Sequence, residues 1–531
     1  MKPRVKLKPN VESALNLSAA AGMSNAPDVA HHGASTRASD VRAWMPRQGS
    51  ADSDLLRDLR NLIVRSRDID RNHGVAKGGV QTLVDNVVGT GLRLSSRPNW
   101  KVLGKTKEWA DEFAELYEYL YHSWWWSTAC HAGDSMTGDQ MTAMQFRAQI
   151  LNGAYLALPL WLPDRGDGFA TKIQPVEVDR LSSPGGILET ARLRNGIKFD
   201  EFGAPIGYYI KKTHPGDAYA DADSIGWEYV TRYTDHGRLR VIHGFDPERS
   251  GQSTGKPLLS SVLPQFKQLD RYTNAEIMAA VVNAMISLVI ESPMSHEQIM
   301  EMFAADGTTD VMEAYQKMRT ENAVSLQAGQ AISLFPGDKA ASFLPQRPAS
   351  GFGAFVENIY RIIGVALDIP YELLMKDFSK TNYSSARAAM LEAWRSFNRR
   401  RDWLGTQWCD PISWLFMEEL VNAGKLDVTP AEFYANRWAY QRCKWIGPGR
   451  GWVDPVKEAE AAAIRIEHGF STLEDECAEQ GRDWRETLAQ IKREADERKR
   501  LELPPVAPMG RSQQPYASDV PNTPTPQQAN A

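Results

Sequence analysis

The chain has 531 residues, of which 42% are hydrophobic and 24% are charged. This composition is ordinary for a soluble globular protein and excludes collagen-like, disulfide-stapled and wholly disordered classes. The length predicts three to four structural units at about 150 residues per domain. Lysine and arginine number 61 against 66 aspartates and glutamates, so the net charge of -5 excludes a basic nucleic-acid coat protein.

Cysteine usage and hydropathy indicate the cellular compartment of the protein. The four cysteines form no C-x-x-C pair, which excludes a zinc ribbon and indicates a reducing environment. The longest apolar stretch, 277–290, is shorter than the roughly 20 residues that span a bilayer, so we expect a buried helix there. The N-terminus is basic but no apolar segment follows it, which argues against a signal peptide. These features predict a soluble, cytoplasmic protein without a membrane partner.

The predicted secondary structure changes several times in the first two thirds of the chain. Residues 1–50 lack a sustained period and are rich in Ala, Ser, Asn and Pro, which predicts a mobile arm. Residues 51–160 show apolar side chains at helical spacing, whereas 170–245 contain short β-prone runs between Gly, Pro and Asp. Residues 257–291 return to a helical pattern.

The last third is predicted to be helical. A stripe begins after Gly353, and a Pro-containing break and a polar segment precede a long helix that starts at Ser384 or Ser385. The C-terminal signals are local, and they predict three capped helices before a disordered Pro/Gln-rich tail at 503–531. The residues that predict the starts of these helices are Asp454 before Pro455, the capping box Ser471–Glu474, and Asp483 with Glu486. Gly469 after His468, and Gly481, predict helix ends.

Recognisable catalytic chemistry is absent from the sequence. The loop Gly251–Lys256 resembles a phosphate-binding loop, but it is one residue short between its glycines and Pro257 stands where a magnesium ligand is needed. His122, Cys130 and His131 could ligate a metal, yet no second pair at ligand spacing supports them. We therefore predict no enzymatic activity, no catalytic residue, no cofactor and no metal.

The triplet Trp124, Trp125 and Trp126 is unusual. Three adjacent indoles cannot all face one core from a helix or a strand, so at least one must reach an interface or a loop contact. Two interpretations stay open, a partly buried loop anchor and a contact between subunits.

Four segments resemble the lambda family of bacteriophage portal proteins, and they occur in the family's order. Together they cover roughly 70–105 and 350–505, whereas 292–348 has no counterpart that we can place. The segments are Arg71–Gly74 with Gly89–Trp100, Ile369–Leu373 with Tyr383–Ala388, Trp445–Arg450, and Gly469–Gly481.

The resemblance implies a mechanical function on an α+β, mostly α-helical fold. Portal proteins form a ring, typically a dodecamer, at one capsid vertex, and double-stranded DNA is packaged and ejected through its channel. The implied partners are further copies of the chain, the terminase large subunit, the major capsid protein and scaffold, and head-completion proteins. The implied location is the virion, after assembly in the bacterial cytoplasm. The slightly acidic charge fits such a channel, because a basic lining would retain DNA.

The family's wing, stem, clip and crown can be placed on this chain. We expect a flexible arm at 1–50, a wing at 51–256 with its strands at 170–245, a stem helix at 257–291, a clip at 292–348, a second stem helix with a channel loop at 349–383, wing-return helices at 384–452 and a helical crown at 453–502.

The channel loop carries the candidate DNA contacts. We expect Lys376 and Lys380 to touch passing phosphates transiently, with Asn382 nearby and Asp377 limiting the attraction. The alternative interpretation of this segment is an ordinary solvated loop on the outside of the ring. Two other functions also stay open for the whole chain, a phage-encoded DNA-processing enzyme and a monomeric capsid-assembly adaptor.

Overall fold

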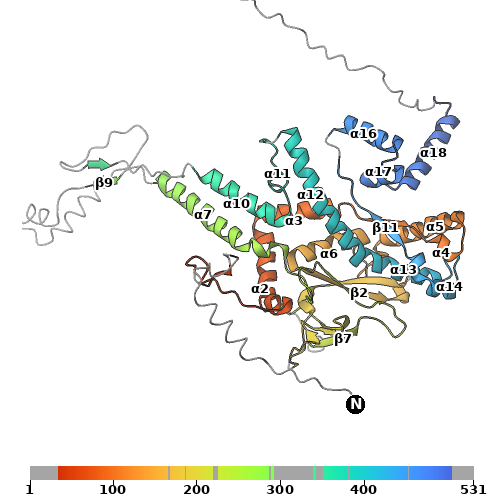
Figure 1. Cartoon of the computed structure of the whole chain (residues 1–531), viewed down its shortest axis with the longest axis horizontal. Helices are drawn as coiled ribbons and strands as arrows, with labels where there is room; N and C mark the ends of the chain where they lie inside the picture. Colours follow the sequence, from red (N-terminus) through yellow and green to blue (C-terminus); the bar gives the residue numbers. More distant parts are fainter. Residues whose placement is uncertain are drawn as a thin grey trace, which may run out of the picture.

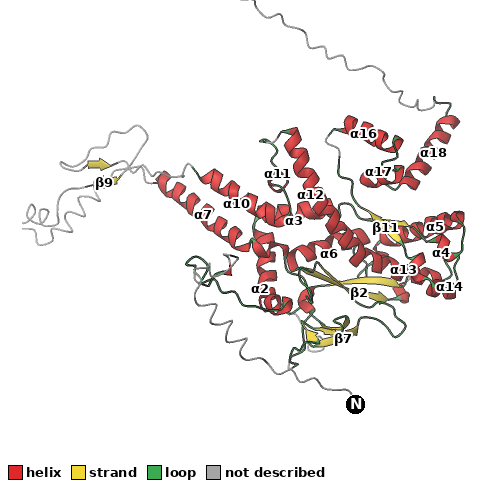
Figure 2. Ribbon diagram, viewed as in Figure 1, coloured by secondary structure: helices red, strands yellow, loops and turns green. Residues whose placement is uncertain are grey.

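The structure is a computed structural model in which helices predominate (Figures 1 and 2). It describes residue 31, residues 34–36 and residues 38–504, the last with gaps at 166–167, 186, 219–224, 286–288, 292–338, 342–350, 381 and 452–453.

Helices dominate the beginning of the body, as the apolar spacing predicts. Thr106 and Thr137 are N-caps, because each side chain accepts a hydrogen bond from a backbone N–H in the first turn. Gln140 returns the bond to Thr137 and completes a capping box. The elements are α2 (Ala51–Asn72), α3 (Gly74–Val87), β1 (Arg93–Ser96), α4 (Trp100–Leu103), α5 (Lys107–Trp125), a 3-10 turn (Thr128–Cys130) and α6 (Gly138–Asn152).

Two antiparallel sheets follow, with strand orders β3-β2-β8 and β4-β5-β6-β7. Strands occur within 170–245 as predicted, but the first begins earlier, at Ala154. Its apolar run Ala154–Trp161 is buried at its N-terminal half, and periodicity alone does not distinguish such a run from a helix. The strands are β2 (Ala154–Trp161), β3 (Thr171–Val176), β4 (Leu193–Arg194), β5 (Ile197–Phe199), β6 (Pro205–Lys211), β7 (Trp227–Thr231) and β8 (Ile242–Phe245), with 3-10 turns at Pro163–Arg165 and Val178–Arg180.

Two helices project from the body side by side (Figure 1). They are α7 (Leu263–Met285), which follows a 3-10 turn at Leu258–Ser261, and α10 (Phe352–Leu367). The ring of Tyr272 on α7 lies 5.1 Å from that of Phe355 on α10. Beyond α7, β9 (Val289–Glu291) pairs antiparallel with β10 (Lys339–Ala341). Apart from β10, the predicted clip at 292–348 lies outside the described residues.

A second group of helices returns to the body after α10. The longest of them begins at Tyr383 with Asn382 as its N-cap, one or two residues before the predicted start. The final strand of the group pairs with β1, Arg93 opposite Ile446, and so joins segments far apart in the sequence. The elements are α11 (Tyr371–Met375), α12 (Tyr383–Leu404), a π-helical turn (Gly405–Cys409), α13 (Asp410–Asn422), α14 (Pro430–Ala435), α15 (Arg437–Tyr440) and β11 (Cys443–Ile446).

Three short helices end the described chain: α16 (Pro455–Glu467), α17 (Leu473–Glu479) and α18 (Trp484–Arg500). The predicted caps at Asp454 and Asp483 are confirmed, since each carboxylate accepts a backbone N–H of the first turn. The predicted cap at Ser471 is wrong by one residue. Thr472 is the N-cap of α17, and its hydroxyl accepts the Asp475 N–H at 3.2 Å.

The largest hydrophobic cluster joins helices from both halves of the chain. Trp124 on α5, Phe397 on α12 and Phe416 on α13 are all buried in it. A smaller cluster lies between the two sheets and includes Leu156 and Tyr208. Among the described residues, no helix combines the length and apolar character that crossing a membrane requires. The predicted domain boundaries stay predictions.

Candidate functional site

The predicted channel loop lies between α11 and α12, and its described residues are exposed at 376–380. Lys376 ends α11 in the left-handed backbone conformation, with φ of 55°. Lys380 extends its ammonium to Glu357 on α10, where Nζ lies 3.3 Å from the carboxylate. The side-chain oxygen Oδ1 of Asn382 accepts the backbone N–H of Ser385 at 2.8 Å, so Asn382 is the N-cap of α12.

Charges in this loop are partly compensated within the subunit. Glu357 accepts hydrogen bonds from both Arg361 and Lys380, and these bonds lower the pKa of the Glu357 carboxyl. Asp377 accepts the Ser379 N–H at 3.0 Å, and hydrogen bonds to Ser379 lower the pKa of the Asp377 carboxyl. Lys376 has no ion-pair partner within 4 Å among the described residues, so it is the less compensated cation of the two lysines.

The tryptophan triplet divides between core and surface. Trp124 is fully buried and stacks on Phe416 with ring centroids 4.3 Å apart. Trp125 is also buried, and its indole N–H donates to Asp139 at 3.1 Å. The subunit's own core covers these two side chains. Trp126 is 48% exposed, as the argument from three adjacent indoles requires for at least one.

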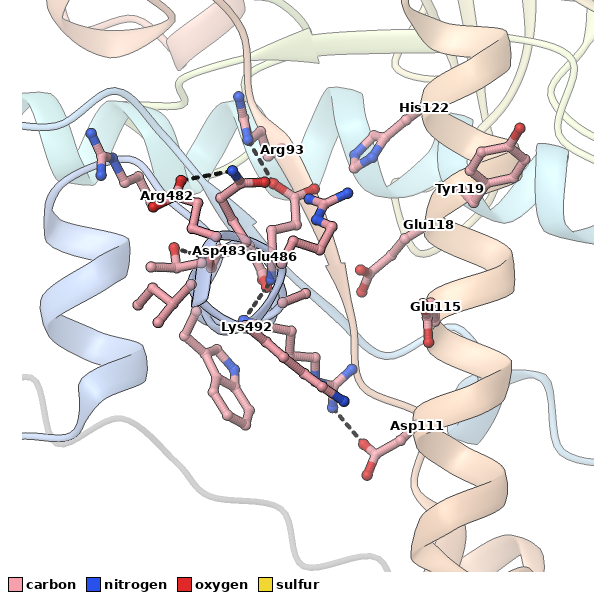
Figure 3. A pocket seen from close by; sticks show the side chains of 18 of the residues that line it. Arg93, Asp111, Glu115, Glu118, Tyr119, His122, Arg482, Asp483, Glu486 and Lys492 are labelled. Carbon is pink, nitrogen blue, oxygen red and sulfur yellow. Dashed lines mark hydrogen bonds and ion pairs between the residues drawn. The ribbon is translucent and has the colours of Figure 1, made fainter. Parts of the chain in front are cut away.

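Trp126 lies at a cleft of about 1440 Å³ between α5 and α18, shown in Figure 3. Its ring stacks on His122 at 4.5 Å, and the Arg93 guanidinium lies 6.0 Å from the ring centroid. Burial, assisted by the positive charge of Arg93, lowers the pKa of His122 to about 4. Burial also raises the pKa of Glu118 to about 7, although this carboxylate accepts the Ser96 N–H at 2.6 Å.

The candidate metal ligands do not form a site. The Cys130 thiol contacts the carbonyl of Ser127 at 3.3 Å, and His131 accepts the backbone N–H of Ser135. Within the described part of the chain, the group with metal-like spacing is instead Glu177, Asp179 and His214. There Nδ1 of His214 accepts the Gly216 N–H at 3.0 Å, which places the proton of a neutral ring on Nε2. The Nε2 atom lies 3.2 Å from Glu177 and 3.9 Å from Asp179, but it makes no hydrogen bond to a described residue.

The loop that resembles a phosphate site is occupied by acidic partners. The ammonium of Lys256 pairs with Glu248 at 2.7 Å. The backbone N–H of Ser253 donates to the buried carboxylate of Asp52 at 2.8 Å. A loop whose amide and lysine both bind carboxylates presents no free cradle for a phosphate at these positions.

Exposed apolar faces on α7 and α10 are the feature that the sequence did not assign correctly. The stretch 277–290 was expected to be buried, but its described part is not: Met278 is 61% exposed, and Ile277 and Val281 are also exposed. On α10, Ile362 is 54% and Val365 78% exposed. The helical spacing was visible in the sequence, but spacing does not say whether the same subunit or another one covers a stripe.

Comparison with known proteins decides the family. The sequence model described as "Phage portal protein, lambda family" matches residues 37–401. The portal protein of Escherichia phage N15 is 31% identical over 90% of this chain and 92% of its own length. Portal protein B of Escherichia phage lambda is 29% identical over 90% of this chain and 91% of its own.

The chain belongs to the lambda family of phage portal proteins. The resemblance read from the sequence is thereby confirmed, and the α+β, mostly helical architecture is that of a family member. A solved structure titled "Neck of native GTA particle computed with C12 symmetry" is more distant. It is 14% identical, covers 85% of this chain and 94% of its own, and gives a TM-score of 0.41.

Proposed function

We propose that this chain is the subunit of a portal ring, a dodecamer at one vertex of a phage capsid through which double-stranded DNA is packaged and ejected. The family match over residues 37–401 supports the assignment. The observation in the structure that supports ring formation best is the pair of exposed apolar faces on α7 and α10.

These faces have the form of a subunit interface. Phe355, Ile362 and Val365 recur on one side of α10 at helical spacing, and Ile277, Met278 and Val281 do so on α7. Each large apolar side chain that leaves water contributes roughly 1.5–3 kcal/mol. A ring requires a heterologous contact whose rotation closes, and two projecting helices offer different faces to the two neighbouring subunits.

Charge substitution on α10 tests this interface. We expect Ile362→Glu to yield a folded subunit that no longer assembles, because the side chain is half exposed in one subunit and buried in the ring. Size-exclusion chromatography with light scattering would then give the 59.4 kDa subunit. The matched control is Phe202→Glu, which places the same charge at an 86% exposed apolar position in the loop between β5 and β6. Equal assembly of both variants would contradict the assigned interface.

The partners follow from the proposed ring. The terminase large subunit would dock on it during packaging, the major capsid protein and scaffold would surround it, and head-completion proteins would attach later. The ring would act without catalysis of its own, in the virion, after assembly in the bacterial cytoplasm. The half-exposed Trp126 is the member of the triplet that could contact a neighbouring subunit.

The channel loop is proposed to touch passing DNA through Lys376 and Lys380. Both are exposed, and Lys380 is tied to Glu357 by a pair that water can screen. Contacts of this kind are weak, which suits a duplex that must slide. We expect Lys376→Glu with Lys380→Glu to leave assembly intact and to lower the yield of packaged DNA.

An equal change of charge elsewhere provides the control. Lys101 and Lys107 are exposed at α4 and α5, away from the loop, and their double substitution by Glu should not affect packaging. The measurement is the amount and length of nuclease-protected DNA in particles from complemented phage. Full-length genomes at the normal rate in the loop variant would contradict the proposed contact.

A further inference from the structure

The C-terminal helical unit, residues 454–503, lacks a hydrophobic attachment to the rest of the subunit. None of α16, α17 and α18 contains a buried residue. Large apolar side chains on it are exposed to solvent instead, including Ile464, Phe470 and Ile491. Apolar burial, which holds most packed elements together, therefore contributes little to the position of this unit.

Ion pairs connect the unit to the body. These side chains are 34–57% exposed, so each pair is weak alone and sensitive to salt. They join β1, the residue that follows it, α5 and β11 to α17 and α18. The pairs are Arg93 with Glu486 at 3.0 Å, Arg97 with Glu474, Asp111 with Arg485 at 2.7 Å, and Lys444 with Asp475 at 3.5 Å.

Two glycine-containing loops form the one close backbone approach that we find between the described parts of unit and body. Gly481 has φ of 71°, and a Cβ added there would lie 2.8 Å from the nitrogen of Gly449. The Arg450 N–H donates to the carbonyl of Glu479 beside them. Without side chains between them, these loops can stay in contact while the helices beyond them rotate.

The cleft between α5 and α18 leaves room for such a rotation. Its volume of about 1440 Å³ separates the two helices, and Figure 3 shows Arg93 and Asp111 extending toward partners across it. The helices are thus bridged by long charged side chains rather than packed face to face. A change of a few ångströms in the cleft width would break ion pairs without opening a core.

We propose that the unit at 454–503 pivots as one body on the contact between Gly449 and Gly481, and that the four ion pairs form a latch that holds it against α5 and β1. Ionic strength determines whether the latch is closed or open. Raising salt from about 0.1 M to about 1 M shortens the screening length from about 10 Å to about 3 Å and releases the unit. Release widens the cleft and brings water to the buried and half-buried polar side chains that line it, His122, Asp483 and Glu118, but it leaves the hydrophobic core of the body unchanged.

Zero-length carbodiimide crosslinking of the full chain tests the latch. The reagent joins Lys444 to Asp475 when the latch is closed, and mass spectrometry measures the yield. The control is the pair Lys380 and Glu357, whose side chains lie 3.3 Å apart and both belong to the body, so that pivoting of the unit does not separate them. We expect the Lys444–Asp475 yield, relative to that of the control, to fall about two- to fivefold between low and high salt.

Charge reversal supplies the second arm. Arg93→Glu should lower the Lys444–Asp475 yield at low salt about two- to fivefold, although it does not touch either crosslinked residue. Adding Glu486→Arg re-creates the pair with its charges exchanged and should restore the yield. A yield that is unaffected by both salt and charge reversal, or that falls in parallel with the control, would overturn the latch.

Discussion

Alanine substitutions at the tryptophan triplet should separate a core role from a surface role. Trp124 is fully buried, stacks on Phe416 and meets the ring of Tyr121 at 5.8 Å. Replacing a buried tryptophan by alanine costs about 3–5 kcal/mol, because transfer free energy is lost and a cavity remains. Trp126 is 48% exposed and has His122 as its main aromatic partner, so Trp126→Ala should cost less than about 1 kcal/mol.

The assay is urea unfolding followed by far-ultraviolet circular dichroism. It is run in the Ile362→Glu background, where we expect a monomer, because ring formation would make the midpoint depend on protein concentration. A third variant, Trp124→Phe, keeps an aromatic ring against Phe416 and removes an indole N–H that has no partner among the described residues. It should cost much less than Trp124→Ala. Equal losses for Trp124→Ala and Trp126→Ala would refute the division of the triplet into core and surface.

Two further predictions concern a cap and a titration. Thr472→Ala should lower the unfolding free energy of the C-terminal unit by about 1 kcal/mol, because it removes the N-cap hydrogen bond of α17, whereas Ser471→Ala should have little effect. Hydrogen exchange of the α17 amides measures both effects. A larger loss for Ser471→Ala than for Thr472→Ala would show that Ser471 is the cap. Burial raises the pKa of Glu118 to about 7, so the folded state binds a proton that the unfolded state releases near its ordinary value of 4.5. The protonated Glu118 side chain therefore contributes fully to the free energy of unfolding below about pH 4.5, and this contribution is lost as the pH rises through 7. Glu118→Gln should become more stable relative to the parent between pH 5 and about pH 8, as measured by urea midpoints, and a pH-independent difference would contradict the raised pKa.

Local chemistry made the C-terminal helices predictable. Asp454 and Asp483 cap the helices that follow them, and Gly469 and Gly481 adopt the left-handed conformation that ends a helix. These features depend on residues within one turn of each other, so the sequence contains all of their determinants. The cap lies one residue after Ser471, because Thr472, also a favoured N-cap residue, stands beside it.

Long-range packing determines which apolar side chains are buried, and local sequence patterns do not reveal this. Trp124 is buried because Phe416, far along the chain on α13, lies against it, and no local pattern indicates that meeting. The stretch that includes Met278 reads as a core helix because it is apolar, yet in one subunit that side chain is exposed. Apolar spacing reports that a face will be covered, and it does not identify the covering chain. The exposure of Lys376 and Lys380 was predictable, since a polar run between apolar helices favours the surface.

Electron microscopy of the purified chain tests the central claim most directly. Negatively stained particles of a portal subunit should be annular, with a central channel and a mass many times the 59.4 kDa of one chain. The Ile362→Glu variant, prepared in parallel, should give only small particles. A wild-type sample that consists of compact single subunits, at protein concentrations of about 10 μM and in low salt, would contradict the proposed ring and with it the DNA channel.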